Sequence, residues 1–309
     1  MPKVRVGITI GDPSGIGPEI TIKAMRKLKG YADFVVIGDA CVWNKAAGIK
    51  FIDLGNVKKN DFQPGQVRGE YGRASIEYLD KALELLENRQ IDCLVTCPIS
   101  KEALNKGGFK FGGHTEYLAA RANRHDLVMM LLNQCLRISL VTRHIPLKDV
   151  ARDLKSEDLY KNILLTHWAL KSLFAIKRPR IVVAGLNPHA SDNGVIGKEE
   201  NRLILPVLKR LKHKSISLDG PLSADVAIAK AAKNEYDCVI AMYHDQALIP
   251  LKLLGNASGV NLTVGLPFIR TSPLHGTAFD IAGKGLARAD SLISAIKLAV
   301  KCTLNQKNA

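Results

Sequence analysis

The N-terminal stretch holds a strand pattern, a glycine-rich turn and a helix start in immediate succession: Lys-Val-Arg-Val-Gly-Ile-Thr-Ile (residues 3–10), then Gly-Asp-Pro-Ser-Gly-Ile-Gly-Pro-Glu (residues 11–19). The alternation in residues 3–10 is typical of a strand, and Pro18 and Glu19 are typical of a first helical turn. A strand that leads through a tight turn into a helix indicates an α/β protein. The turn lacks the dinucleotide fingerprint Gly-x-Gly-x-x-Gly, so it indicates either an anion-binding helix start or only a tight connection.

The same alternation of strand and helix patterns continues along the chain. Apolar runs typical of strands lie near 4–10, 34–37, 91–96, 138–142, 181–185, 238–242 and 260–266. Helix-patterned stretches lie near 18–29, 72–88, 115–123, 156–175, 198–211, 223–233 and 290–302. This order predicts a mostly parallel, layered α/β sheet. The stretches 97–113 and 254–272, which contain proline and glycine, are the expected crossings between domains.

Composition narrows the class of protein. The 309 residues are 47% hydrophobic and carry a formal net charge of +15, which suits a globular protein with a basic surface. The basic residues lack interleaved aromatics, so we expect no nucleic acid as a partner. No apolar run reaches the ~18 residues of a membrane span, and the six cysteines form no Cys-x-x-Cys pair. We therefore expect no membrane partner, reduced thiols and a cytoplasmic location.

Three histidines have the most informative surroundings. His144, His189 and His244 each follow directly after an apolar strand pattern, in Arg-His-Ile-Pro, Asn-Pro-His-Ala and Tyr-His-Asp-Gln. The carboxyl ends of parallel strands form the ligand-binding edge of an α/β sheet. Three neutral imidazoles meeting at that edge would make an open divalent-metal site. The alternative for each ring alone is an ordinary hydrogen-bonded or surface histidine.

A second group of residues is suited to binding an anion. His114 and Thr115 follow two glycines and precede a helix pattern, although Thr115 is equally suited to be an N-cap. Further along, Arg270 stands alone in an apolar, turn-rich stretch, with Lys252 and Asn261 before it. A guanidinium in such surroundings suits bidentate contact with phosphate or carboxylate, and the alternative is a structural salt bridge.

The segment from Leu274 to Gly285 is a loop of small residues before the last helix pattern. Such a loop can lie against a nucleotide or simply connect two elements. It is similar to the His-Gly-Ser-Ala-Pro-Asp-Ile-Ala-Gly-Lys-Gly element with which isopropylmalate dehydrogenases bind the adenosine of NAD. That similarity implies a cofactor site at His275, Gly276, Thr277, Ala278 and Asp280.

These motifs together resemble those of the 4-hydroxythreonine-4-phosphate dehydrogenase (PdxA) family. The most specific are Gly-Gly-His-Thr-Glu, Asn-Pro-His-Ala, Tyr-His-Asp-Gln, Gly-Leu-Pro-Phe-Ile-Arg-Thr-Ser and His-Gly-Thr-Ala, in family order. The resemblance implies that the three histidines bind the metal and that the substrate contacts are His114, Thr115, Lys252, Asn261 and Arg270. The N-terminal turn departs from the common Gly-Glu-Pro-Ala-Gly-Ile-Gly-Pro-Asp but keeps its charge and approximate shape.

The resemblance also implies an architecture. It is that of isocitrate and isopropylmalate dehydrogenases, with two αβα domains around a cleft. Residues 1–115 with 262–309 would form the domain that holds both termini and the adenosine-binding loop. Residues 116–261 would form the metal- and dimer-forming domain. The family is homodimeric, with its site completed across the subunit interface.

The implied reaction is oxidation of 4-phosphooxy-L-threonine by NAD or NADP, followed by decarboxylation to 3-amino-2-oxopropyl phosphate. Zinc, magnesium, manganese or cobalt would serve as the metal. Asp245 is the candidate for orienting a metal histidine or taking a proton, and Lys252 is a second catalytic candidate. Dehydrogenases of 4-phospho-D-threonate or 4-phospho-D-erythronate share these residues and remain alternatives, as does a metal-dependent phosphohydrolase.

Overall fold

The computed structural model describes residues 3–43, 48–254 and 258–308, and the chain divides into two compact units. The first unit comprises Met1–His125 and Leu266–Lys307, and the second is Asp126–Gly265 with the last two residues. The chain therefore leaves the first unit after residue 125 and returns after 265, where 115 and 261 were expected. Residues 255–257 of the expected crossing at 254–272 lie outside the described residues.

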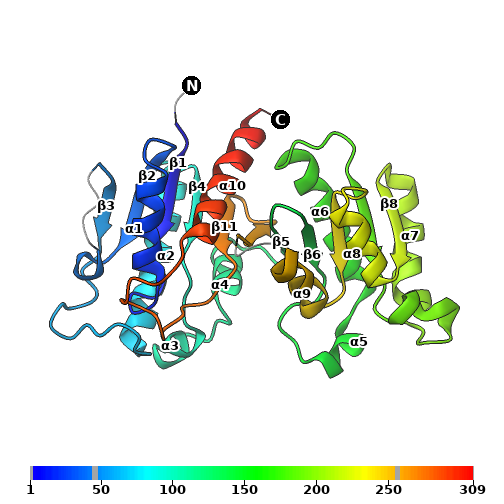
Figure 1. Cartoon of the computed structure of the whole chain (residues 1–309), viewed down its shortest axis with the longest axis horizontal. Helices are drawn as coiled ribbons and strands as arrows, with labels where there is room; N and C mark the ends of the chain where they lie inside the picture. The colour runs from blue at the N-terminus through cyan, green and yellow to red at the C-terminus, as the bar shows by residue number, and fades with distance from the viewer. Residues whose placement is uncertain (1–2, 44–47, 255–257, 309) are drawn as a thin grey trace. The chain divides into compact units, whose positions relative to one another are not determined.

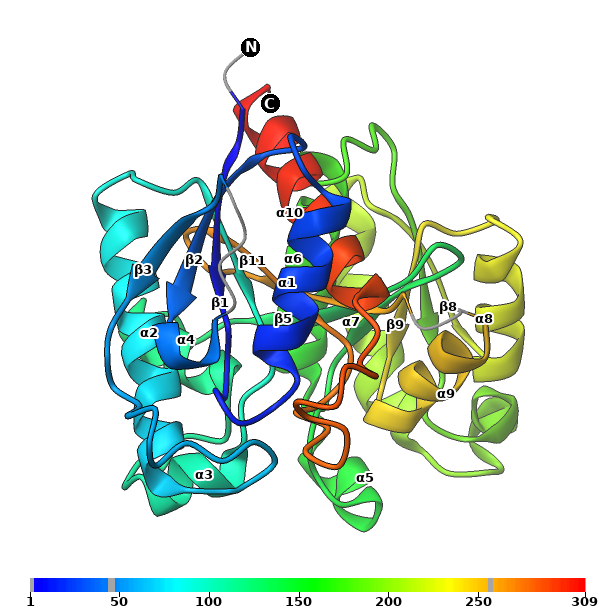
Figure 2. The ribbon, with the colours of Figure 1, turned by 60° about the vertical axis from the view of Figure 1, so that its left-hand side comes forward.

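The first unit contains a parallel sheet with the strand order β3-β2-β1-β4-β11. Its strands are β1 (Arg5–Thr9), β2 (Asp33–Gly38), β3 (Lys50–Asp53), β4 (Cys93–Thr96) and β11 (Ile269–Pro273). Its helices are α1 (Gly17–Lys27), α2 (Gly69–Glu87), α3 (Lys101–Lys106), α4 (His114–Arg121) and α10 (Asp290–Lys307). Helices α1 and α10 pack together on one face of the sheet and α2 covers the other, with α3 packed against α2 (Figure 2). Because β11 comes from the C-terminal part of the chain, both ends of the sequence build this unit.

The second unit contains a mixed sheet with the order β10-β5-β6-β9-β7-β8. Strands β5, β6 and β8 are labelled in Figure 1. Its strands are β5 (Val128–Leu132), β6 (Arg137–Leu140), β7 (Arg180–Ala184), β8 (Ser217–Leu222), β9 (Cys238–Ala241) and β10 (Val260–Val264). The pairs β10–β5 and β5–β6 are antiparallel, whereas β6–β9, β9–β7 and β7–β8 are parallel. Its helices are α5 (Val150–Asp153), α6 (Ser156–Ser172), α7 (Leu205–Leu211), α8 (Ala224–Ala232) and α9 (His244–Leu254).

The α/β class predicted from the sequence is confirmed, and each of the seven predicted strand runs overlaps a strand. Four strands were missed: β3, β5, β8 and β11. Strand β8 contains Gly220 and Pro221, and β11 contains Arg270 and ends at Pro273, so both lack the apolar alternation of a strand. Helices α3, α5 and α9 were also missed. The first two are only six and four residues long, and α9 begins within three residues of β9 and contains Pro250.

Buried apolar side chains on the central strands form the core of each unit. Val6, Ile8 and Val95 in the first unit and Val182 and Ile240 in the second are 0% exposed. All six cysteines are free thiols. Within the described parts of the chain, no helix combines the length and apolar character that a membrane crossing requires.

Candidate active site

The three histidines follow the carboxyl ends of three adjacent strands. Strand β9 lies between β6 and β7 and is parallel to both, so the three chains leave the sheet at one edge. His144 follows β6, His189 follows β7, and His244 is the first residue of α9 after β9. The three histidines therefore follow strands that end at one edge of the sheet, as the sequence predicted.

The structure brings two of these rings together. The ring centroids of His144 and His244 are 5.5 Å apart, with the rings tilted by 50°. Two imidazoles on one tetrahedral zinc ion, with Zn–N bonds of about 2.1 Å, have centroids roughly 5 Å apart. This pair therefore fits a shared divalent ion. Over the described ranges, however, no group of three His, Cys, Asp or Glu side chains is gathered into a metal set, so His189 does not join the pair within one chain.

His189 lies on an exposed loop with an uncommon backbone. Five consecutive residues that are not glycine, His189–Asn193, have φ angles between 45° and 67°. The left-handed conformation costs about 1–2 kcal/mol for each such residue, so the surrounding contacts must hold this loop in place. Accumulated backbone strain of this kind is typical of functional sites.

Asp245 lies beside the second metal candidate. The Nδ1 atom of His244 is 2.6 Å from Oδ1 of Asp245, an arrangement that orients the ring and leaves Nε2 to face a ligand. Lys252 is exposed on the same helix, α9. Asn261 lies on β10, and its Oδ1 is buried without a partner among the described atoms. These three candidates and the histidine pair all belong to the second unit.

In the first unit, Arg270 is almost fully buried, at 2% exposure, on β11. Its Nε and Nη2 donate hydrogen bonds of 3.2 and 2.6 Å to the hydroxyl of Thr96, at the end of β4. Burial lowers the pKa of Arg270 to about 10, partly opposed by Glu116, so it stays a cation at neutral pH. A guanidinium that is buried, charged and oriented by a neutral hydroxyl is well prepared to bind an anion.

His114 and Thr115 begin helix α4. The Nε2 atom of His114 is buried and has no hydrogen-bond partner in the part of the chain that the structure describes. Burial, and secondarily the charge of Arg270, holds the pKa of His114 well below its usual range, so the ring is neutral. The N-cap interpretation of Thr115 is wrong, because Gly113 occupies that position and Thr115 lies inside the first turn, at 7% exposure.

The proposed cofactor loop packs against the glycine-rich turn. The carbonyl of Thr277 accepts a 2.9 Å hydrogen bond from the backbone N–H of Ile16, and a Cβ on Gly15 would lie 3.1 Å from the same oxygen. Gly276 and Asp280 are exposed, whereas Ala278 is half-buried with a φ of 43°. The Nε2 atom of His275 is buried and unpaired among the described residues, and burial lowers the pKa of its ring.

Sequence reasoning missed a cavity of about 560 Å³ beside this turn. Its lining includes Pro13 and Gly15 of the turn, the aromatic rings of Trp43 and Phe62, and Gly283 of the C-terminal loop. Aromatic faces and glycine backbone are suitable surroundings for a flat heterocycle. The lining residues come from four separate segments of the chain, so no single stretch of sequence indicates this cavity.

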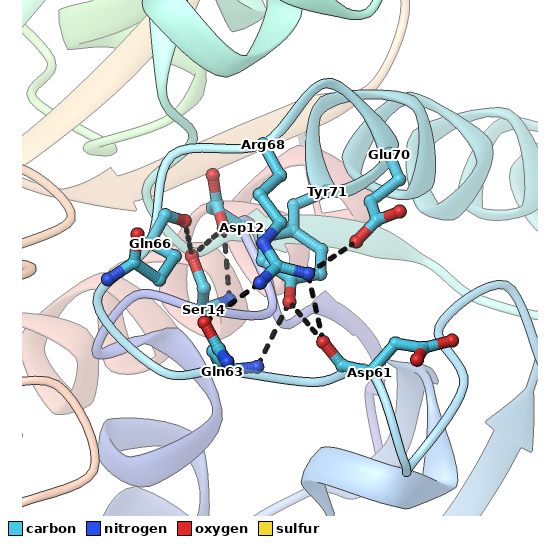
Figure 3. A network of polar contacts seen from close by, with 8 residues as sticks. All are labelled: Asp12, Ser14, Asp61, Gln63, Gln66, Arg68, Glu70 and Tyr71. Carbon is cyan, nitrogen blue, oxygen red and sulfur yellow. Dashed lines mark hydrogen bonds and ion pairs between the residues drawn. The ribbon is translucent and has the colours of Figure 1, made fainter.

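Asp12 is the other feature that sequence reasoning left without a role. The backbone N–H of Ser14 donates to Oδ1 of Asp12, and the Ser14 hydroxyl lies within hydrogen-bond distance of both that oxygen, at 2.9 Å, and the carbonyl oxygen of Gln66, at 2.7 Å (Figure 3). Arg68 and Tyr71 hold the preceding part of that loop through Asp61 and Gln63 (Figure 3). Burial raises the pKa of Asp12 to about 6, and its Oδ2 is buried and unpaired among the described atoms.

The burial of His114 predicts a pH dependence of stability. Its pKa is lower in the folded chain than in the unfolded chain, so as the pH falls below about 6.5 the unfolded chain binds the proton first. The free energy of unfolding should fall in that range, by at most about 1.4 kcal/mol per pH unit from this group. The variant His114→Gln should lose this part of the slope between pH 6.5 and 5. Thermal unfolding midpoints of both proteins across that range measure it, and parallel curves would contradict the neutral ring.

Comparisons with known proteins agree with the architecture and the motifs. Residues 14–299 match the family model described as pyridoxal phosphate biosynthetic protein PdxA. A 4-hydroxythreonine-4-phosphate dehydrogenase of a Sulfurihydrogenibium species is 42% identical over 96% of this chain and 98% of its own length. A protein of Oceanobacillus iheyensis whose proposed name is D-threonate 4-phosphate dehydrogenase is 40% identical over 97% of this chain and 98% of its own.

Solved structures also show the similarity to 4-hydroxythreonine-4-phosphate dehydrogenase. The crystal structure of 4-hydroxythreonine-4-phosphate dehydrogenase from Klebsiella pneumoniae superposes with a TM-score of 0.88, at 36% identity over 97% of this chain and 99% of that one. Isocitrate dehydrogenase from Methylococcus capsulatus, at 14% identity and a TM-score of 0.52, shares the fold alone, over 98% of this chain and 87% of that one. The sequence motifs, the family model and the full-length relatives lead to one conclusion: the chain belongs to the PdxA family.

Proposed function

We propose that this protein is a metal-dependent dehydrogenase that oxidises 4-phosphooxy-L-threonine with NAD or NADP. The product, 2-amino-3-oxo-4-phosphooxybutanoate, is a β-keto acid and loses carbon dioxide to give 3-amino-2-oxopropyl phosphate, in the route to pyridoxal 5′-phosphate. The observation that carries the proposal is the position of three histidines at the ends of three adjacent parallel strands, with His144 and His244 already 5.5 Å apart. The names of the relatives support the choice of substrate.

His144, His189 and His244 would hold the divalent ion. When bound, zinc, magnesium, manganese or cobalt would lower the pKa of the substrate alcohol and stabilise negative charge during decarboxylation. Asp245 keeps the ring of His244 oriented through its Nδ1 atom and is one candidate for taking the alcohol proton. Lys252, exposed on the same helix, is the other candidate.

The proposed substrate contacts form two groups, one in each unit taken by itself. In the first unit, buried Arg270 provides a fixed positive charge for the phosphate, and the neutral ring of His114 has an Nε2 atom that no described residue occupies and that is available for a hydrogen bond. Thr115 lies next to His114 in the first turn of α4 and has a hydroxyl to donate. In the second unit, exposed Lys252 adds a positive charge, and Asn261 has a buried oxygen with no hydrogen-bond donor among the described residues.

The cofactor would lie along the loop from His275 to Asp280, where NAD or NADP would accept the hydride. Half-buried Thr277 and Ala278 and exposed Gly276 leave backbone accessible on that loop. The adjoining cavity, with Trp43 and Phe62 in its lining, has the size and aromatic character that an adenine needs. Free thiols and the absence of a membrane-spanning helix among the described residues are compatible with work in the cytoplasm.

Two alternatives remain testable. A D-threonate or D-erythronate phosphate differs from the proposed substrate mainly at the amino-bearing carbon, and the relative from Oceanobacillus iheyensis favours this class. A phosphohydrolase would use the same histidines and cations but would need no cofactor loop.

An enzyme assay separates these possibilities. The purified protein should form NADH or NADPH with 4-phosphooxy-L-threonine, lose that activity on chelation and regain it with a divalent ion. The D-threonate and D-erythronate phosphates, measured in parallel, should react at least about tenfold more slowly, a difference of roughly 1.4 kcal/mol in the barrier. Comparable rates on all three would contradict the named substrate, and phosphate release without the cofactor would favour a hydrolase.

Arg270→Lys tests the phosphate contact. Lysine keeps the charge but loses the planar fork that Thr96 orients, so KM should rise about 10–100-fold with a smaller change in kcat. Arg5→Lys is the matched control in the same unit, because Arg5 pairs with Asp92 and has no assigned role. Equal KM values for the two variants would remove Arg270 from the substrate site.

We also propose a homodimer, in which the partner subunit completes the metal site. Large apolar side chains are exposed next to the histidine segments: Val195 at 82%, after the His189 loop, and Ile249 and Leu253 at 58% and 78%, on α9. Exposed apolar groups of this size mark association surfaces. They lie on the same segments as His189 and His244, so a partner subunit that covered them would lie beside two of the metal candidates.

Sedimentation analysis tests the dimer. The wild-type mass should be about twice the 33.7 kDa of one chain. Val195→Glu should shift it toward the monomer and weaken metal binding, because a charge would be buried at the contact. The control Leu286→Glu, at 65% exposure in the first unit, should stay dimeric. A monomeric wild type that binds metal fully would contradict this proposal.

A further inference from the structure

The side chain of Gln246 joins the strand ends that carry two of the histidines. Its Oε1 accepts a 2.7 Å hydrogen bond from the backbone N–H of Met242, between β9 and His244. Its Nε2 donates a 2.8 Å hydrogen bond to the carbonyl of Gly185, between β7 and His189. The residue is only 7% exposed. One buried amide therefore ties together two segments that are far apart in the sequence.

The chemistry of these two bonds requires an amide. The backbone N–H of Met242 needs an acceptor, and the carbonyl of Gly185 needs a donor, which an amide alone supplies from its two ends. A flipped amide would place donor against donor and acceptor against acceptor. The partners therefore determine how the side chain is oriented, and a group of the same size but with two equivalent oxygens would satisfy only one of them.

A buried carboxylate, that of Glu200, also holds the loop that carries His189. Oε1 of Glu200, at 1% exposure, accepts 2.8 and 2.7 Å hydrogen bonds from the backbone N–H groups of Leu186 and Asn187. Its Oε2 accepts a 2.9 Å bond from the side-chain amide of Asn187, two residues before His189. These bonds to a charged acceptor hold the chain immediately before the strained left-handed run.

Gly185 lies next to both the side chain of Gln246 and the carboxylate of Glu200. A Cβ on this residue would lie 2.9 Å from Cα of Ala190 in the histidine loop and 3.2 Å from Oε1 of Glu200. The loop that carries His189, the carboxylate of Glu200 and the Gly185 carbonyl that Gln246 binds therefore lie close together. On the other side of β9, the hydroxyl of Thr142 donates a 2.6 Å bond to the carbonyl of Met242, which links the His144 segment to the same point.

We propose that Gln246 is a positioning residue that fixes the segments of His189 and His244 relative to each other, so that each presents its ring in the position that binds a divalent ion in the dimer, with Glu200 holding the His189 loop. The inference rests on the proposed function, since it assumes that these histidines are metal ligands. Its physical basis is that a ligand set kept in place before the ion arrives loses little conformational freedom on binding. Groups that orient metal ligands in this way typically change metal affinity by about 10–100-fold when they are removed.

Two substitutions remove the link in different ways. Gln246→Met keeps the length of the side chain but leaves the Met242 N–H and the Gly185 carbonyl unpaired. Gln246→Glu keeps the size and the bond from Met242, but places an oxygen against the Gly185 carbonyl. The matched control is Thr166→Val, which removes a buried 2.8 Å hydrogen bond to Ser139 on β6 of the same unit, rather than a bond that joins the segments of His189 and His244. All three should lower the thermal midpoint.

Zinc and cobalt titrations of the whole protein provide the decisive measurement, by competition with a chelating dye and by the visible spectrum of cobalt. Both Gln246 variants should bind the metal about 10–100-fold more weakly than wild type, with Gln246→Glu the milder of the two, whereas Thr166→Val should bind as wild type does. Unchanged affinity in folded Gln246→Glu would overturn the inference, as would an equal loss in Thr166→Val.

A measurement on the metal-free protein distinguishes a failure of this inference from a failure of the proposed function. In the metal-free protein, the ring resonances of His189 and His244 should be sharp in the wild type and exchange-broadened in Gln246→Met, because the two segments then move independently. If the wild type binds no divalent ion, the proposed function is wrong whatever these spectra show. If it binds the ion and the spectra of the variant are unchanged, the positioning role is wrong and the metal site stands.

Discussion

The parallel pairing of β6, β9 and β7 is the constraint on which the site depends. Parallel strands joined by backbone hydrogen bonds must end at the same edge of the sheet, so the residues that follow them are brought near one another whatever their separation in the sequence. His144 and His244 lie at that edge with their rings 5.5 Å apart, and His189 follows the third strand. The sheet brings the segments together, and the buried side chains of Thr142, Gln246 and Glu200 then determine their local arrangement.

The electrostatics of the first unit, taken by itself, are suited to an anion. Arg270 is buried in contact with a neutral hydroxyl, and His114 nearby is kept neutral by burial and by the arginine's own charge. One fixed positive charge beside a neutral imidazole suits a phosphorylated substrate, because the charge is poorly screened and the ring still offers a hydrogen bond. The overall charge of +15 adds a long-range attraction for anions but cannot by itself select one.

Much of the fold was predictable because its signals are local. The strands before the three histidines are short apolar runs, and their succession with helix patterns indicates a parallel α/β sheet. Strands β8 and β11 carry residues that strands usually avoid, and α9 starts where a turn is expected, so tertiary contacts override their local preferences. The N-cap interpretation of Thr115 was wrong for a similar reason, since one residue type suits two neighbouring positions and packing chooses between them.

The sequence by itself determined the class of fold, the family and the identity of the candidate ligands, because motifs such as Asn-Pro-His-Ala are contiguous and their chemistry depends on residue type. Only the tertiary structure decided which groups support them. Gln246 and Gly185 are 61 residues apart and Arg270 and Thr96 are 174 apart, so neither contact leaves a pattern in the chain. The physical reason is that a buried hydrogen bond depends on where two strands end in space, which the pairing of the whole sheet determines.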